Sequence, residues 1–408
     1  MPTQSHAPDA HRPGERHSPG AFVGAGLGSL HGPRRLEGCW VLGPDTPHPI
    51  ELIESLVRRE QRSGSGWALL LPYELGGWVE PSARSRHADP LGFPSAVLMR
   101  LGEPTEPTGA AIPGKWSVGQ LASSMGRHRY ERGVRRVLEY IAAGDIYQAN
   151  LAHHLHASFS GDPLGFAQQL ISSTRPRYGA VLRFEHAGRS HTICSISPEL
   201  FLRLDRETGV LETRPMKGTR PIEADASELE SSDKDRAELN MITDLMRNDL
   251  GRVCRMGSVR VHDPRLIEPH DSGVLQASSV VRGRLRDGVG LGELIRATFP
   301  PGSVTGAPKV RAMQIIDELE DRPRHAYCGS IMHIDPAGNI ECSVAIRTAH
   351  IWGDIDPDGT GGILNGQLVY PVGAGIVADS DPANEWAETL VKAGALGRSL
   401  GLGLDLEP

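Results

Sequence analysis

Four short β-prone segments follow one another over residues 178–214, with only turn residues between them. The segments are YGAVLRF, HTICSIS, LFLRL and GVLETR, whose branched and aromatic side chains are typical of strands. A second series of strands is predicted over 325–379, with turns at DPAGN (335–339) and at Asn365-Gly366. Strands in such succession indicate antiparallel sheets rather than a parallel sheet wound from alternating strands and helices.

Helices are predicted apart from these strands. One helix ends near Gly144, and its Val134, Val137 and Ile141 fall near one face. The other long helices are expected at about 233–250, 308–320 and 382–396. The pattern therefore predicts an α+β fold, with large antiparallel sheets forming a sandwich and helices packed outside it. The long range of the strand pairings favours one interleaved domain.

Composition divides the chain into three parts. Residues 1–20 are rich in Pro, His, Gly and Ser and almost free of apolar side chains, so we expect a disordered tail. Residues 21–115 form an N-terminal subregion in which WALLLPYELGGWVEP (67–81) predicts a buried strand entering a turn. Residues 120–405 form the main domain. Since 39% of the 408 residues are hydrophobic, the chain can bury a core.

Charge and cysteine content exclude several classes of protein. The formal charge is −7 and the cationic residues are dispersed, which argues against a nucleic-acid or anionic-membrane surface. The five cysteines form no CxxC pair, so neither a disulfide framework nor a zinc site is indicated. Residues 21–30 make a poor signal peptide, and no run approaches the roughly 20 apolar residues of a membrane span. We expect a cytoplasmic protein.

A lysine between two arginines is the first candidate for chemistry. Lys217 lies in ETRPMKGTRP (212–221), between Arg214 and Arg220. An amine at its usual pKa of about 10.4 is protonated and does not attack an electrophile. Neighbouring positive charge and burial both disfavour an ammonium group, which makes a lysine in this setting a candidate nucleophile. A solvated basic turn is the alternative, which surface statistics alone would favour for these ten residues.

Two predicted helices carry paired carboxylates. The residues that share a face are Asp235 with Glu238 on the first helix, and Glu385 with Glu388, followed by Lys392, on the last. The last helix is expected to begin after Ser380 or Asp381 as its cap, with Pro382 at its first position. Two such pairs could surround a hard cation such as Mg²⁺, which prefers oxygen ligands. Solvated helix faces are the alternative.

Two glycine-rich turns lead into helices and offer backbone N–H groups to an anion. FPPGSVTGAPKVR (299–311) precedes a helix start near Pro308, and YPVGAGIVADSDP (370–382) precedes the last helix. Neither turn has the spacing of a nucleotide-binding loop. Arg347, on a predicted strand, has a planar guanidinium that suits a carboxylate, although an exposed strand arginine is the alternative.

Taken in order, the motifs of this chain resemble those of the chorismate-utilising enzymes. That family includes anthranilate synthase component I, aminodeoxychorismate synthase component I, and the isochorismate and salicylate synthases. The resemblance covers about residues 120–400 in unbroken order. The segments that carry it are GDIYQANL (144–151), SPELFLR (197–203), TRPMKGTRP (213–221), DRAELNMITDLMRNDLGRV (235–253), FPPGSVTGAPKVRAMQIIDELE (299–320), YCGSIMHID (327–335), ECSVAIRT (341–348) and VGAGIVADSDPANEWAETLVKA (372–393).

The resemblance implies a magnesium-dependent chorismate site within the domain at 120–405. Glu238 and Glu388 match metal ligands of the family, and Asp235 and Glu385 match outer acidic positions. The positions implied to contact the substrate and its carboxylates are Thr305, Tyr327, Arg347, Gly373 and Gly375, with Lys392 expected beside them.

Two positions separate the branches of the family. Members that add water carry a lysine general base where this chain has Gln148, and glutamine cannot activate water in that way. Anthranilate synthases usually read PIAGT where aminodeoxychorismate synthases read PIKGT, and PMKGT here, with Lys217, is similar to the latter. The resemblance therefore implies that Lys217 attacks ring carbon 2 and expels the 4-hydroxyl beside the acid Glu199. Ammonia then attacks carbon 4 and displaces the lysine.

The implied function is the conversion of chorismate and ammonia to 4-amino-4-deoxychorismate, for 4-aminobenzoate and folate. Anthranilate synthase component I, which forms anthranilate and pyruvate, is the main alternative; an isomerase and a non-catalytic chorismate-binding subunit are the others. Gln276 replaces a histidine found in many relatives, and the N-terminal part is short for the family, without a clear tryptophan-binding segment. No cysteine has a nucleophile-elbow context, since Cys328 resembles a packed strand residue, so a separate glutamine amidotransferase subunit is expected.

Overall fold

The computed structural model describes residues 22–27, 30–62, 64–104, 114–221, 225–270, 274–358 and 361–401. The tail expected at residues 1–20 lies outside these ranges.

The described strands pair in one continuous antiparallel path with two arms. The first arm consists of β7 (Gln148–Gly161), β19 (Ile363–Ile376), β18 (Thr348–Ile355), β9 (Arg189–Ser197) and β8 (Tyr178–His186), with β5 (Trp116–Val118), β6 (Ala122–Ser123) and β15 (Gly306–Ala307) also on β7. The path continues through β1 (Phe22–Leu27), β2 (Leu30–Leu42), β4 (Ala96–Pro104) and β3 (Gly66–Leu71). The second arm consists of β16 (Ser330–Ile334), β17 (Ile340–Val344), β10 (Leu200–Asp205), β11 (Val210–Arg214) and β14 (Val274–Arg284), which also pairs with β12 (Met216–Pro221) and β13 (Arg260–His270).

The predicted strand series is confirmed. Strands β8 to β11 occupy the four segments between 178 and 214, and DPAGN forms the turn between β16 and β17. The turn predicted at Asn365-Gly366 is wrong. Both residues lie inside β19, where the register with β7 shifts and Asn365 has a positive φ of 49°. A β-bulge, like a hairpin turn, needs a residue that tolerates a positive φ. The Asn-Gly dipeptide therefore could not distinguish a bulge from a hairpin turn.

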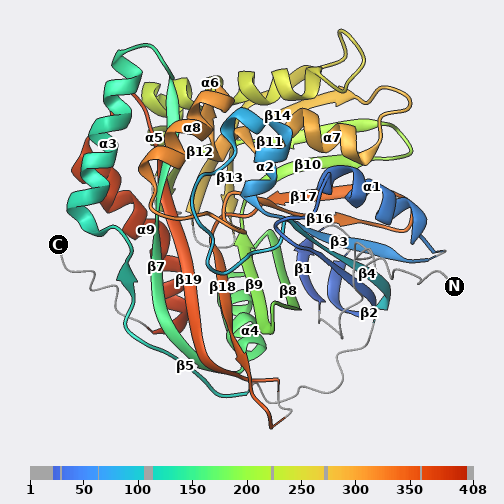
Figure 1. The fold of residues 1–408 in the computed structure, drawn as a ribbon. Coiled ribbons are helices and arrows are strands. Elements are labelled where there is room, and N and C mark those ends of the chain that lie inside the picture. The colour runs from blue at the N-terminus through green and yellow to red at the C-terminus, as the bar shows by residue number, and fades with distance from the viewer. Residues whose placement is uncertain are drawn as a thin grey trace, which may run out of the picture.

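Helices pack against both arms of the sheet path (Figure 1). Helix α9 (Pro382–Leu400) packs on β19 and on α3 (Gly126–Ala142), α8 (Lys309–Leu319) packs on β7, and α6 (Asp233–Gly251) packs on β12, β13 and β14. The remaining helical segments are α1 (Pro49–Arg59), α2 (Gly76–Val79), α4 (Pro163–Thr174), α5 (Ala226–Ser231), α7 (Leu291–Thr298), and the 3₁₀ turns η1 (Tyr73–Leu75), η2 (Pro81–Ala83) and η3 (Gly302–Val304). The α+β class and the four long helices are confirmed.

Strand β3 joins the N-terminal subregion to the rest of the molecule. Trp67, Leu69 and Leu71 enter one hydrophobic core, whereas Ala68 and Leu70 enter another on the opposite face of the strand. Successive side chains of a strand point to opposite faces, so a strand buried on both reads as a continuous apolar run. Burial on both faces explains the continuous apolar sequence WALLL. In the second core, Ala68 and Leu70 pack with residues of β9 and β16.

No helix among the described residues has the length and apolar character needed to cross a membrane.

Candidate functional site

A cavity of about 880 Å³ lies where β12, β19, α6 and α9 come together. Most of the residues predicted from the sequence line it: Glu199, Lys217, Asp235, Glu238, Gln276, Tyr327, Arg347, Gly373, Gly375, Glu385, Glu388 and Lys392. These residues come from both arms of the sheet and from two helices. The fold therefore brings them together although they are dispersed over nearly 200 positions of the sequence.

Lys217 projects from β12 toward α6 and β19. Its Nζ lies 3.7 Å from Oε2 of Glu238. A Cβ atom built on Gly375 would lie 2.6 Å from the same Nζ, so glycine at this position makes room for the lysine. Of the two arginines that flank it in the sequence, Arg214 donates from Nε to Glu212 at 2.7 Å, and the side chain of Arg220 lies outside the described residues. The lysine is thus held against a carboxylate.

Gln148 and Thr305 lie behind the cavity wall. The Gln148 side chain is fully buried, and neither polar atom of its amide has a hydrogen-bond partner among the described residues. Its Nε2 would lie 3.2 Å from a Cβ on Gly375, which places the amide next to Lys217. Thr305 is also fully buried and does not line the cavity, and its Oγ1 donates to the carbonyl of Pro301 at 2.8 Å.

Glu199 is a buried carboxyl group at the turn between β9 and β10. It is 4% exposed, and Ser303 Oγ donates a hydrogen bond of 2.5 Å to its Oε1. Burial raises the pKa of Glu199 to about 7, against the opposing effects of Ser303 and of the positive charges of Lys217, Arg347 and Lys392. A carboxyl group that keeps its proton near neutral pH can act as a general acid.

Arg347 and Tyr327 supply a cation and a hydroxyl to the same cavity. Arg347 lies between β17 and β18 with a positive φ of 50°, and burial lowers the pKa of its guanidinium. The Tyr327 hydroxyl lies 3.0 Å from the point where a Cβ on Gly373 would stand. A guanidinium in such a cavity suits a carboxylate ligand. Cys328 is buried in the hydrophobic core as predicted, but it lies in the turn before β16 rather than in a strand; burial raises the pKa of its thiol to about 12.

One glutamate on each of α6 and α9 lies beside a lysine. Lys392 Nζ lies 2.7 Å from Oε1 of Glu388 and donates to the carbonyl of Gly373 at 2.8 Å, which ties α9 to β19. Glu238 approaches Lys217, as described above. Within the described ranges, no three His, Cys, Asp or Glu side chains are grouped closely enough to hold a metal ion by themselves. Glu238 and Glu388 thus each lie beside a lysine.

Sequence reasoning missed residues that lie beside the predicted ones. Asn150, Ser303 and Val304 line the cavity, and Ser303 contacts Glu199 directly. The loop before α8 was expected to present the helix N-terminus to an anion; Lys309, in the first turn, does not line the cavity, and its side chain bonds Asp249 at 2.7 Å. The loop reaches the cavity through η3, several residues earlier. The residues of η3 were quoted in the motif, but nothing in their spacing distinguished them from those at the helix start.

Comparisons with known proteins agree on one family. The sequence model of the family described as chorismate binding enzyme matches residues 94–398. Aminodeoxychorismate synthase component 1 of Escherichia coli (strain K12) is 42% identical over 285 residues, which cover 68% of this chain and 59% of the relative. Anthranilate synthase component 1 of Aquifex aeolicus (strain VF5) is 40% identical over 285 residues, covering 68% of this chain and 54% of the relative. The matched part of the chain thus spans little more than half of these relatives.

The fold is also similar to solved structures. The crystal structure of anthranilate synthase component I from Streptococcus pneumoniae TIGR4 superposes with a TM-score of 0.69, over 96% of this chain and 94% of that chain. The two sequences are 22% identical, so this likeness concerns the fold alone.

Proposed function

Because the chain belongs to the chorismate-binding enzyme family, we propose that it acts as an aminodeoxychorismate synthase component 1 and converts chorismate and ammonia to 4-amino-4-deoxychorismate. The observation that carries the proposal is Lys217, whose amine faces the cavity beside Glu238 and Gly375. Relatives with this name in three enterobacteria are 40–43% identical to the chain, which supports the same branch.

The proposed reaction consists of two displacements that leave the ring otherwise unchanged. The neutral amine of Lys217 forms a bond to ring carbon 2, both ring double bonds shift, and the 4-hydroxyl leaves as water with a proton from Glu199. Ammonia then bonds to carbon 4, the double bonds shift back, and the lysine leaves carbon 2 as an amine. The carboxylate of Glu199 takes up the proton that ammonia loses. The sum is chorismate plus ammonia to aminodeoxychorismate plus water.

The remaining residues orient the substrate in this proposal. Arg347 pairs with a substrate carboxylate through its planar guanidinium, and Tyr327 donates a hydroxyl hydrogen bond. Gly373 and Gly375 allow the ring to approach the backbone, since a side chain at either position would meet Tyr327 or Lys217. Gln148 lies behind the wall next to Lys217, and its amide cannot activate water.

The carboxylates of α6 and α9 fit a magnesium ion as part of the proposal. Glu238 and Glu388 would hold it, with Asp235 and Glu385 as outer acidic groups. Their oxygens are the ligands that Mg²⁺ prefers, and the ion commonly takes its other ligands from water and substrate. When bound, the ion supplies positive charge to a substrate carboxylate. The two lysines that now face these glutamates occupy positions suited to a cation.

A separate glutamine amidotransferase and a cytoplasmic location complete the proposal. All five cysteines are free and buried, a state that suits a reducing compartment and supplies no exposed thiol for glutamine hydrolysis. The designation component 1 of the relatives is consistent with a second component.

Identification of the product tests the function. Purified protein with chorismate, magnesium and ammonium is expected to form a product that keeps the enolpyruvyl group, because Gln276 cannot exchange a proton at neutral pH for the elimination step. Mass spectrometry identifies the product, and a lactate dehydrogenase assay measures pyruvate. Stoichiometric pyruvate with a fluorescent 2-aminobenzoate would instead assign the chain to the anthranilate synthases. No consumption of chorismate would overturn both assignments.

A further inference from the structure

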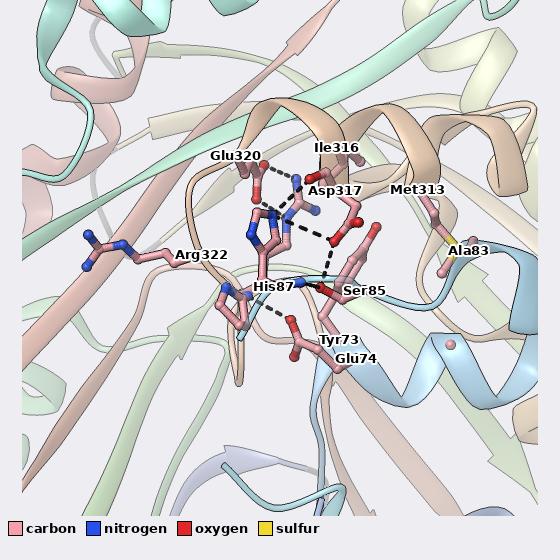
Figure 2. Close-up of a pocket in the computed structure, with 13 residues that line it drawn as sticks. Tyr73, Glu74, Ala83, Ser85, His87, Met313, Ile316, Asp317, Glu320 and Arg322 are labelled. Atoms are coloured by element: carbon pink, nitrogen blue, oxygen red, sulfur yellow. Dashed lines mark hydrogen bonds and ion pairs between the residues drawn. The ribbon is translucent and has the colours of Figure 1, made fainter. Parts of the chain in front are cut away.

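A buried ion pair follows α8 and lines a small cavity of about 30 Å³, separate from the large one (Figure 2). Glu320 is 5% exposed and Arg324 is 3% exposed. Two contacts join them: Arg324 Nη2 to Glu320 Oε1 at 2.5 Å, and Nε to Oε2 at 2.9 Å. The guanidinium also lies 4.6 Å from the ring centre of Tyr73, so three side chains form one packed unit.

The pair holds two segments of the wall of the large cavity. Arg324 donates to the carbonyl of Val304 at 3.1 Å and to that of Asn150 at 2.6 Å. Glu320 Oε1 accepts from the backbone N–H of Ala152 at 2.9 Å. Asn150 and Val304 both line the large cavity, from β7 and η3 respectively. A single guanidinium thus fixes both segments from behind.

The positive charge of Arg324 affects how the cavity wall can receive a substrate that carries two carboxylates. A carbonyl oxygen carries partial negative charge, and a cation behind the wall draws the oxygens of Asn150 and Val304 away from the cavity. The same contact fixes Ser303, the residue before Val304, whose hydroxyl bonds Glu199. Without Arg324 the two carbonyls would lose their partner, and buried unpaired carbonyls cost free energy until they turn to another donor.

We propose that Glu320 and Arg324 are positioning residues that hold the Asn150 and Val304 wall in the geometry that accepts the substrate carboxylates and keeps Ser303 on Glu199. This inference rests on the proposed function for its substrate. The pair acts through backbone groups and touches no reacting atom.

A second pair, which is partly buried at the start of α8, provides a control. Lys309 Nζ lies 2.7 Å from Asp249 Oδ2 and donates to the carbonyl of Thr298 at 2.8 Å. It joins α8 to the C-terminal ends of α6 and α7, and neither Asp249 nor Thr298 lines the large cavity. A purely structural role for both pairs predicts the same consequences of removing either one.

The deciding variants neutralise each pair in full. Removing one partner of a buried pair leaves an uncompensated charge and is strongly destabilising, whereas replacing both is often tolerated. The comparison is Glu320→Gln with Arg324→Met against Asp249→Asn with Lys309→Met. Arg324→Lys keeps the charge and provides a milder variant should the double variant not fold.

The expected result is a split between stability and kinetics. Both double variants unfold at comparable urea concentrations, but only the Glu320/Arg324 variant raises the KM for chorismate about ten-fold or more and lowers kcat. Hydrogen exchange shows faster exchange at residues 148–152 and 302–305 in that variant alone. Arg324→Lys lies between it and the wild type, because an ammonium lacks the planar fork that serves two carbonyls and a carboxylate.

The opposite result is equally clear. A folded Glu320/Arg324 variant, or Arg324→Lys, with unchanged exchange in both segments and wild-type KM would overturn the proposal. Hydrogen exchange is measured without substrate. If the wild-type protein failed to consume chorismate, the proposed function would be refuted, but hydrogen exchange would still show whether the pair holds the wall.

Discussion

At Glu199 the protein keeps a carboxyl group out of water, inside a cavity that also contains cations. Burial dominates there and raises its pKa from 4.5 to about 7. The hydrogen bond from Ser303 and the nearby positive charges act in the opposite direction and are insufficient to cancel it. The proton of Glu199 therefore remains available near neutral pH.

This pKa predicts how activity depends on pH. If protonated Glu199 supplies the proton to the departing hydroxyl, kcat/KM for chorismate falls as the pH rises through about 7. Glu199→Gln should lower kcat about 10²- to 10⁴-fold and remove this limb from the profile. If kcat/KM of the Glu199→Gln variant still fell at the same pH, the titrating group would be another residue.

The same shift predicts a pH dependence of stability. The folded state binds more protons than the unfolded state between pH 4.5 and 7, so the contribution of Glu199 is fully present at the lower pH and is lost as the pH rises through about 7. Urea unfolding of wild type and Glu199→Gln at pH 5 and pH 8 measures it. The free energy of unfolding of the wild type, relative to the variant, should be higher at pH 5.

Lys217 gives a covalent prediction. With chorismate and magnesium but no ammonia, intact-protein mass spectrometry should detect an adduct one water lighter than chorismate plus protein. Lys217→Ala abolishes the adduct because no other amine takes its place at carbon 2. Lys309→Ala, which removes a lysine from a pair outside the cavity, should keep it. An adduct that persists in Lys217→Ala would remove this lysine from the nucleophile role.

At the scale of the elements, α6 and α9 act as rigid carriers of the cavity carboxylates. Ser232 caps α6 through the N–H of Asp235 at 3.2 Å, and Asp381 caps α9 through the N–H groups of Ala383 and Asn384. Both caps fix the helix start within two turns of the carboxylates that line the cavity. The position of the glutamates therefore follows from local hydrogen bonds as well as from packing.

Removing one of these carboxylates should weaken magnesium binding. We expect Glu388→Ala to lose magnesium-dependent turnover while remaining folded, since the site loses negative charge and a direct ligand. Glu385→Ala, at an outer position, should lower magnesium affinity about 10- to 100-fold. Calorimetry without substrate measures the affinity. Glu139→Ala, on the exposed face of α3, serves as the control. Undiminished wild-type turnover in excess chelator would contradict the assignment.

The elements themselves were largely predictable because their determinants are local. A cap, a proline at the first position and a spaced apolar face define α9 in the sequence, and apolar runs bounded by turn residues define β8 to β11. Asn365-Gly366 was misread because its chemistry permits either a turn or a bulge. Pairing with the distant strand β7 makes this segment a bulge rather than a turn, and the residues around Asn365 do not specify that pairing.

The site was predictable for a different reason. Glu238, Glu388 and Lys217 were found through their resemblance to a family pattern and their shared helix faces. The Glu320 and Arg324 pair has the i, i+4 spacing of an ordinary surface pair, and only the fold buries it behind the cavity wall. Likewise, the sequence gives no indication that Ser303 reaches Glu199, about a hundred residues away.

At the scale of the whole molecule, the buried cysteines predict which nitrogen source the chain can use. Burial raises the pKa of Cys194 and Cys328 to about 12, which leaves little thiolate for attack on glutamine. Purified protein should therefore use ammonium but not glutamine, as measured by product formation. Addition of an amidotransferase partner should confer use of glutamine. Glutamine-dependent turnover by the chain alone would contradict the two-component arrangement.

The cavity is formed by β12 from one arm of the sheet and β19 from the other, and this affects how the protein folds. Lys217 and Gly375 come into contact only after the intervening chain has formed its distant pairings, and such long-range contacts slow folding. Substrate binding should therefore appear late during refolding, after most secondary structure has formed. A ligand that bridges the two arms stabilises only the completed fold, by an amount that grows with its concentration. Acquisition of binding thus measures the completion of folding of the entire chain.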